Sequence, residues 1–415
     1  MSVATNQRAP SLALLAAVTA IGFATLHIVV PSLPLLSQIF ESSAAEAQLV
    51  LTLYLVGIAL GQLFYGPVSD RFGRRPVLLG GLGLYLAGTV VCGAAWSLPV
   101  LIVGRVMQAC GACAGIVLGR AIIRDVYDRE AAARGIAIVM MAMTLAPAVS
   151  PSVGAYLAEW VSWRAIFLVL GVVGTAVLLL VYARLPETNV RPARLDPLQM
   201  LRAYAILARS PQFAGFALCG ACASAAWFTF CASAPHVLIE TLHRPPSAYG
   251  AMILLPMATY MAGNAVAARF TVQLGTAALI IAGRLLAFAA LIGMALWYGL
   301  AGLGAWGLFL PIALGAIGDG LSQPAAMASG LSVHPEFAGT ASGVMGFLQM
   351  TTAAIGTLVV ALLPYDFATS MVTVVTVFVG LALGFGIFAL HRQSRASNAL
   401  LPDLRLRPLR QHGEG

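Results

Sequence analysis

The sequence predicts an all-α integral membrane protein with twelve transmembrane helices. Hydrophobic residues make up 60% of its 415 residues and charged residues only 9%, and the mean hydropathy is +0.91. A helix needs about 20 apolar residues to cross a bilayer, so this length holds about a dozen crossings joined by short loops. Almost no chain is left over for a soluble domain.

The excess of positive charge fits the same class of protein. The formal net charge is +8, and all 23 cationic residues are arginine. Arginines in the loops of a membrane protein face anionic lipid, so the charge does not indicate nucleic acid as a partner. No cleaved signal peptide is predicted, because the first apolar run directly follows the polar residues 1–10 and is long enough to be a span.

Six apolar runs predict the spans of the first half. They cover about residues 11–30, 47–65, 77–95, 98–119, 135–157 and 163–183. The first run ends at Pro31 and Pro34, residues that interrupt a helix. A charged connection, residues 120–134, separates the fourth span from the fifth.

A polar stretch rich in Arg and Pro, residues 184–210, divides the chain. Asp196 is a predicted N-cap and Pro197 the first residue of a helix in which apolar residues lie opposite Arg202 and Arg209. This pattern predicts a short amphipathic helix on the membrane surface. We therefore expect an N-terminal bundle at residues 1–184, a linker at 185–210, a C-terminal bundle at 211–390 and a tail at 391–415.

Six further apolar runs predict the spans of the second half. They cover about residues 213–232, 248–268, 277–298, 305–326, 338–363 and 367–390. The arginine-rich loops fall on one side, with an even number of spans between them, which predicts that both termini are cytoplasmic. Residues 263–275 follow the eighth span as residues 66–73 follow the second, so the halves weakly repeat each other. Two such parallel halves indicate a secondary transporter with its site between them.

The loop between the second and third spans carries one acid among several arginines, with glycines around it. Its candidate residues are Gly66, Asp70, Arg71, Gly73, Arg74 and Arg75. The glycines predict a tight connection between adjacent spans. The single carboxylate is suited to dock on a helix N-terminus or an arginine. The alternative is an arginine-rich flank that only fixes topology, but such a flank does not need the ordered glycines and acid.

Polar side chains inside the predicted spans are functional candidates, since such groups are costly in a bilayer. Arg105 shares a helix face with Gln108, and its alternative role is to extend outward to lipid headgroups. His27 lies at a similar depth and could hydrogen-bond that guanidinium or take up a proton, or simply pack or line a cavity. Asp319, near the centre of the tenth span, could load and release a proton, or be satisfied by a neighbouring helix. Arg284 in the ninth span is expected to reach the headgroups and to be structural.

The fifth span and a set of soft side chains predict a moving helix and a cavity. Pro147, Pro151 and Gly154 bend the fifth span and free backbone carbonyls, which serves gating or leaves a static kink. Adaptable methionine and aromatic side chains suit a promiscuous apolar site, although packing and lipid-facing roles are common alternatives. The candidates for this cavity are Met140, Met143, Trp227, Phe228, Met257, Tyr260, Phe347 and Met350.

Small residues in the fourth span predict close packing between helices. Gly111, Gly115 and Gly119 recur at every fourth position. Two Cys-Gly-Ala-Cys tetrapeptides, which begin at Cys110 and Cys219, lie in apolar runs without nearby His or acidic ligands. We interpret them as small packing residues, and expect neither a metal nor an organic cofactor.

These motifs resemble those of a known transporter family. Residues 66–75 are similar to the loop between spans two and three of the major facilitator superfamily, and residues 105–111 resemble its fourth-span motif, common in proton-coupled members. Residues 120–125, the fifth span with its two prolines, and residues 335–343 are similar to the Bcr/CflA drug-resistance transporters. The resemblance covers nearly the whole chain.

The resemblance implies the major facilitator fold and the export of antibiotics and other small amphipathic compounds in exchange for entering protons. Asp70 and its arginines would lock the cytoplasmic side through the start of span eleven, and Arg105 would take part in proton coupling. One departure is that family members commonly carry an Asp near the position of His27. Either His27 or Asp319 replaces this acid, or the coupling or the cargo differs.

Other functions share part of this evidence. A metabolite or nutrient carrier of the same fold would have the same motifs, because they serve conformational cycling and not substrate choice. An enzyme is disfavoured by the lack of His-Glu-x-x-His and Gly-x-Ser-x-Gly sequences, and a channel by the loop motif. We expect a monomer in a bacterial inner membrane, with drug-like molecules, protons and lipid as its partners.

Overall fold

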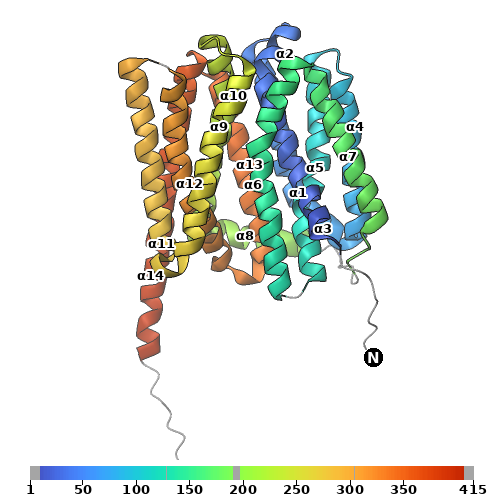
Figure 1. Ribbon diagram of the computed structural model, residues 1–415. Coiled ribbons are helices and arrows are strands. Elements are labelled where there is room, and N and C mark those ends of the chain that lie inside the picture. Colours follow the sequence, from blue (N-terminus) through green and yellow to red (C-terminus); the bar gives the residue numbers. More distant parts are fainter. Residues whose placement is uncertain (1–9, 128, 190–196, 303, 406–415) are drawn as a thin grey trace, which may run out of the picture.

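Long apolar helices that run nearly parallel make up most of the computed structural model, which describes residues 10–127, 129–189, 197–302 and 304–405 (Figure 1). Within that part of the chain, 11 helical segments are long and apolar enough to cross a membrane. One of them, Pro246–Ala301, has 56 residues and breaks at Gly275, where φ is +77°. It therefore supplies two crossings. The prediction of twelve spans is confirmed.

The first half contains the helices that come before the surface helix. They are α1 (Leu12–Ile28), α2 (Leu33–Ile39), α3 (Ala44–Phe72), α4 (Arg74–Gly93), α5 (Leu98–Val126), α6 (Arg129–Trp160) and α7 (Trp163–Arg184). α1 ends at Ile28, just before the predicted break at Pro31 and Pro34, but the apolar helical segment as a whole continues to Ile39. A 3₁₀ turn, Val30–Ser32, joins α1 to α2, and both prolines lie in first turns, where a missing N–H costs nothing.

The connection between α3 and α4 is shorter than expected. α3 continues through Gly66 to Phe72, so the turn consists of Gly73 alone, at φ +96°. A side chain would be strained at this φ, and a Cβ would also meet the Glu187 carboxylate. The predicted connection at residues 120–134 is likewise mostly helical, in the ends of α5 and α6.

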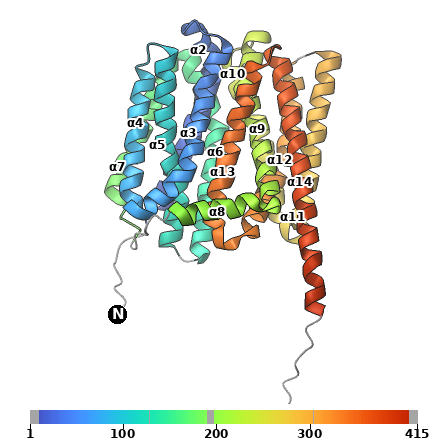
Figure 2. The same ribbon diagram turned by 180° about the vertical axis from the view of Figure 1, so that it is seen from behind.

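A surface helix, α8 (Pro197–Arg209), separates the halves and crosses beneath α3 and α13 at one end of the bundle (Figure 2). Ala203 and Leu207 are buried, whereas Leu201 and Arg202 are exposed. The prediction of a short helix here is confirmed, and its proposed N-cap, Asp196, lies outside the described residues.

The second half contains the remaining helices. They are α9 (Pro211–His236) with a π-helical turn (Val237–Thr241), α10 (Pro246–Met252), α11 (Leu254–Ala301), α12 (Ala305–Val333), α13 (Ala338–Leu362) and α14 (Phe367–Arg405). The described chain begins and ends at the same end of the bundle (Figure 1). We call this end the terminal face, and the opposite end, where α2 and α10 lie, the distal face.

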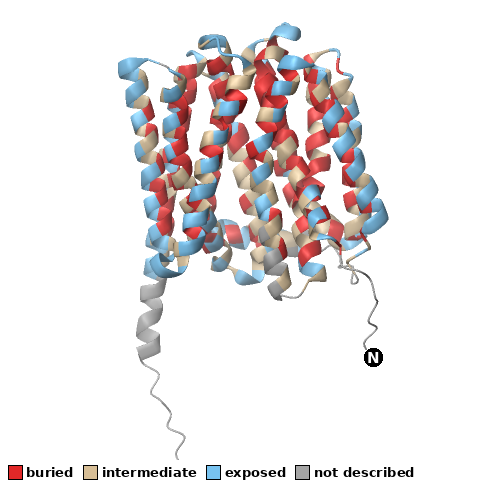
Figure 3. Cartoon of the chain, viewed as in Figure 1, coloured by how far each residue is buried: buried red, intermediate tan, exposed pale blue. Residues whose placement is uncertain are grey.

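The outer surface of the bundle carries apolar side chains, as contact with lipid requires. Buried residues lie where helices face one another, and exposed residues lie on the outer surfaces (Figure 3). On α7 the outward residues include Leu168, Val172 and Leu179, which are all large, apolar and exposed. Because hydrocarbon tails solvate such side chains, their exposure identifies the lipid-facing side of this helix.

Glycines bring the helices of the first half into close contact, as predicted for α5. A Cβ at Gly111 would collide with the backbone of α4 at Tyr85, and one at Gly115 would collide with the backbone of α1 at Val18. Gly119 similarly faces Thr19. Helices in a bilayer associate through such close packing because lipid supplies no hydrophobic drive between them.

Gly111→Ala should destabilise the protein, because α4 and α5 must separate to admit the methyl group. We expect a loss of about 1–3 kcal/mol, typical of overpacking. The matched control is Gly80→Ala on α4, where no atom lies within 4 Å of the added Cβ. Thermal unfolding in detergent measures both, and an equal effect of the two variants would contradict this packing.

Candidate functional site

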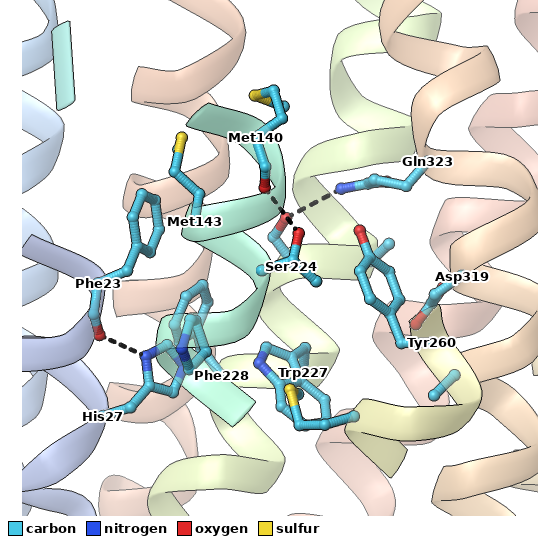
Figure 4. Close-up of a pocket in the computed structure, with 15 residues that line it drawn as sticks. Phe23, His27, Met140, Met143, Ser224, Trp227, Phe228, Tyr260, Asp319 and Gln323 are labelled. Atoms are coloured by element: carbon cyan, nitrogen blue, oxygen red, sulfur yellow. Dashed lines mark hydrogen bonds between the residues drawn. The ribbon is translucent and has the colours of Figure 1, made fainter. Parts of the chain in front are cut away.

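A cavity of about 230 Å³ lies between the two halves of the bundle. Its walls come from α1 and α6 on one side and from α9, α11 and α12 on the other (Figure 4). Six of the predicted methionine and aromatic side chains line it: Met140, Met143, Trp227, Phe228, Met257 and Tyr260. The other two do not, because Met350 is buried in the hydrophobic core and Phe347 packs against that core.

His27 lies at the boundary between the halves and lines this cavity. Its side chain is buried, and its Nδ1 lies 2.9 Å from the Phe23 carbonyl oxygen. The imidazole packs against Phe228, with 5.6 Å between ring centroids. Nε2 has no hydrogen-bond partner among the described residues. The sequence allowed a bond between His27 and Arg105, but no such bond is found in the described part of the chain.

An ion pair links two helices of the second half in the cavity wall. Arg284 Nη1 of α11 lies 2.8 Å from Asp319 Oδ1 of α12. The Arg284 side chain is 0% exposed, so the expectation that it reaches the lipid headgroups is wrong. The Asp319 side chain is 22% exposed and lines the cavity. The ion pair neutralises the charge of the buried guanidinium. Its carboxylate remains accessible from the cavity.

Two further polar side chains extend the ion pair along the wall. Arg284 Nη2 donates to Gln323 Oε1 at 3.3 Å, and Gln323 Nε2 donates to Ser224 Oγ at 3.3 Å. The sequence interpretation missed both Gln323 and Ser224. Gln323 lies one helical turn after Asp319, a spacing that places the two on the same face of α12 and that could have revealed it.

Arg105 is equally buried, but it lies in the first half, outside the residues that line the cavity. Its Nη1 donates to Gln108 Oε1 at 2.7 Å and to the Thr25 carbonyl at 3.1 Å. Its guanidinium lies 4.0 Å from the centroid of the Tyr54 ring. Gln108 in turn donates to Thr89 at 2.8 Å. Arg105 therefore does not extend to the headgroups, and no carboxylate pairs with it among the described residues.

At the terminal face, the acid and arginines of the loop motif form a network. Arg74 lies 2.6 Å from Asp70 and 2.9 Å from Asp125. The Glu187 carboxylate, which follows α7, accepts the backbone N–H groups of Arg74 and Arg75 at 2.8 and 3.1 Å. Glu187 thus caps α4, a partner that the sequence interpretation missed. Arg71 is exposed, with its guanidinium 5.2 Å from the centroid of the Phe72 ring.

A second cavity, of about 300 Å³, separates this network from the start of α13. Asp70 and Arg74 lie on one side, and Gly339 and Thr340 of the first turn of α13 on the other. Gly66 and Arg120 also line it. Within the described residues, no hydrogen bond joins Asp70 to α13. The two halves are therefore not latched together at this point.

At the distal face the two halves are joined directly. Ser152 Oγ of α6 donates to the Gly250 carbonyl of α10 at 2.6 Å. Gln48 of α3 donates to the Thr357 carbonyl of α13 at 2.9 Å. Glu159 also accepts the Ser247 backbone N–H at 2.9 Å. Hydrogen bonds between the halves thus lie on the distal side of the central cavity in the part of the chain that is described.

The predicted gating helix, α6, connects the cavity with these distal contacts. It is continuous through Pro147 and Pro151. Pro147 lines the cavity, and Gly154 packs so closely on α1 that a Cβ would collide with the Ile28 carbonyl. Gly154 is therefore required for close packing of α6 on α1.

Known proteins resemble this chain over most of its length. A chloramphenicol resistance protein of Pseudomonas aeruginosa is 33% identical over 365 residues, covering 85% of each chain. A bicyclomycin resistance protein homolog of Haemophilus influenzae is 27% identical over 345 residues, covering 82% of this chain and 86% of the relative. The crystal structure of a bacterial homolog of the human lysosomal transporter Spinster superposes with a TM-score of 0.71 at 17% identity, covering 91% and 95% of the two chains.

Twelve crossings in two halves, with a cavity between them, define a multi-pass membrane protein of the major facilitator fold. The family model described as Major Facilitator Superfamily matches residues 12–357. The chain belongs to this superfamily.

Asp319→Asn should destabilise the protein, because it leaves the Arg284 guanidinium buried without its counter-charge. Breaking a buried pair in this way costs about 3–5 kcal/mol. The double variant Arg284→Met/Asp319→Leu removes both charges and should regain most of that loss. Thermal unfolding in detergent tests this, and an additive loss in the double variant would contradict the pairing.

Proposed function

We propose that this protein is a secondary active transporter that exports small amphipathic drugs in exchange for protons. The observation that carries the proposal is the central cavity, which lies between the two halves and has the Arg284–Asp319 pair in its wall. Substrate sites of such transporters lie at the interface between repeats, and a titratable group there can couple to substrate binding. The drug-resistance relatives support a drug-like cargo.

The proposed cycle is alternating access between two rigid bundles, residues 1–184 and 211–390, joined by residues 185–210. The arginine-rich terminal face is the cytoplasmic one in a bacterial inner membrane, by the positive-inside rule. The bonds from Ser152 and Gln48 then seal the outer side in this conformation. Export requires these bonds to break while the cytoplasmic ends of the bundles close. A monomer suffices, and neither a metal nor an organic cofactor takes part.

In this cycle the loop motif is the cytoplasmic latch. When the bundles close, Asp70 crosses the cavity that now separates it from Gly339 and docks on the N-terminus of α13, where backbone N–H groups attract an anion. Gly73 makes the sharp turn, Gly66 keeps the surface of α3 free of a side chain, and Arg74 holds the carboxylate. Arg71 and Arg75 anchor the loop at the membrane surface.

Asp319 is the proposed proton carrier. Its carboxylate is the charged group that lines the central cavity, so a proton can reach it from the same space as the substrate. Protonation removes the negative charge that holds Arg284, and the pair must then rearrange. His27 is the second candidate, because it faces the same cavity. Arg105 and Gln108 position α1 through the Thr25 carbonyl next to His27.

α6 is the proposed gating element. Pro147 lines the central cavity, and Ser152 makes an outer contact with α10. Pro151 lies between these two residues in the helix, and Gly154 lies just beyond Ser152. A helix with missing backbone hydrogen bonds bends at lower cost than a regular one, so a shift at the cavity can open the outer contacts.

Proteoliposomes with a trapped pH dye test the coupling. Adding chloramphenicol should move protons in wild-type vesicles, and Asp319→Asn should abolish this movement because the amide cannot titrate. His27→Ala should retain it if Asp319 is the carrier. Proton movement in Asp319→Asn, with loss in His27→Ala, would assign the role to His27 instead. No proton movement in the wild type would contradict antiport, and uptake rather than extrusion would favour a nutrient carrier.

Asp70→Asn and Arg105→Ala should each abolish drug resistance in cells while the folded protein persists. The first removes the latch anion, and the second removes the donor that holds the Thr25 carbonyl. Arg202→Ala, an exposed change on α8, is the matched control and should keep resistance. The measurement is the inhibitory drug concentration at equal membrane expression. Full resistance in either test variant contradicts its assignment.

A further inference from the structure

The residues described around the central cavity give it no unmatched negative charge. Among those that line it, Asp319 and His27 are the groups that can take up a proton. The Asp319 carboxylate is already paired with Arg284 at 2.8 Å. With this carboxylate ionised and the imidazole neutral, the ion pair and the cavity together have a net charge of zero.

Protonation makes the cavity more positive, never negative. A proton on Asp319 leaves the Arg284 charge unmatched in the wall, and a proton on His27 adds another positive charge. A permanent cation brought into this cavity loses its hydration and meets no free carboxylate among the lining residues in exchange. The aromatic faces of Trp227 and Phe228 can each attract a cation by about 0.5–2 kcal/mol, which is less than the several kcal/mol that an ion loses on leaving water. The cavity therefore disfavours cations at every step of the proposed cycle.

The amide, phenol and carboxylate of the cavity are gathered on one side. Gln323, Tyr260 and Asp319 lie opposite Phe23 and His27 (Figure 4). The side near Phe23 also carries Met143, so it offers apolar contacts beside the His27 imidazole, whereas the opposite side offers an amide, a phenol and a carboxylate. Gln323 and Asp319 already bond Arg284, and they offer their remaining lone pairs to a ligand that bears hydroxyl or amide groups.

We propose that this cavity selects uncharged amphipathic compounds, with an aromatic or apolar face and an edge bearing hydroxyl or amide groups, and rejects permanent cations. The inference rests on the proposed function, since it narrows the cargo of the same site. Gln323 is the specificity-determining residue: it touches both the ion pair and Ser224, and its neutral amide keeps the net charge of the wall at zero.

Equilibrium binding to the full chain in lipid nanodiscs tests this selection. The neutral probe is chloramphenicol. The cationic probe is its analogue in which a trimethylammonioacetyl group replaces the dichloroacetyl group, so that the amide, hydroxyl groups and ring stay the same. We expect the wild type to bind the neutral probe at least 10-fold more tightly than the cation.

Substitutions at Gln323 separate charge from hydrogen bonding. Gln323→Glu adds one unmatched negative charge, whether Arg284 pairs with the new carboxylate or with Asp319, and should shift the preference at least 10-fold toward the cation. Gln323→Met, of similar length, should weaken binding of the neutral probe several-fold without any gain for the cation. Arg284→Gln removes the ion-pair partner of Asp319 and should also favour binding of the cation. The test therefore does not depend on the folding of a single variant.

The outcomes distinguish the two proposals. Equal binding of both probes by the wild type, or a cation preference, overturns the charge selection and leaves drug export standing. An unchanged preference in folded Gln323→Glu overturns the role of Gln323 and with it this inference. Binding of neither probe contradicts the proposed function itself.

Discussion

The cost of burying charge in an apolar bundle controls how this protein is built. Arg105 and Arg284 are both completely buried, and the two halves satisfy them differently. In the second half Arg284 has a carboxylate at 2.8 Å. In the first half the partners of Arg105 in the described chain are neutral: an amide oxygen, a backbone carbonyl and the face of Tyr54. The Arg284–Asp319 pair can change its net charge, because its carboxylate can take a proton. The surroundings of Arg105 cannot, since a guanidinium stays protonated.

This difference assigns separate tasks to the halves in the proposed cycle. Arg105 ties α5 to α1 through a carbonyl, and Gln108 continues to α4, so the network fixes the geometry of the first half. The Arg284–Asp319 pair ties α11 to α12 through a bond that a proton can weaken. A transporter needs both kinds of contact. Fixed contacts keep each bundle rigid, and an ion pair that a proton can weaken lets the cavity wall respond to protonation.

The sequence predicted the fold because its main cause is local. Each crossing needs a run of about 20 apolar residues, and such runs are directly visible. The close packing at Gly111 was also predictable, because small residues at every fourth position share one helix face. The end of the first span was not predictable from Pro31, because a proline in the first turn of a new helix does not interrupt the span.

The candidate site was predictable only in part, because it depends on how helices rotate and pair. Asp319, which the structure places in the cavity lining, was a candidate because an acid deep in a span is costly. Its partner was missed, because an arginine nearer a span end can extend to headgroups, and only the packing of α11 on α12 brings it to an acid 35 residues away. Met350 belongs to a suitable residue type but faces the hydrophobic core, and residue type alone does not give helix rotation.

In the proposed mechanism, a histidine rather than an acid at position 27 has a physical consequence beside the Arg284–Asp319 pair. A carboxylate at position 27 would place an unmatched negative charge in the cavity, opposite the wall that carries Asp319. Here that position holds a group that is neutral or positive, packed against Phe228. The carboxylate that remains lies in the second half with its own arginine. In the proposed mechanism, the proton and the drug therefore both bind at the cavity wall that carries Asp319. The transported drug is uncharged, so the proton carries the only charge that is exchanged.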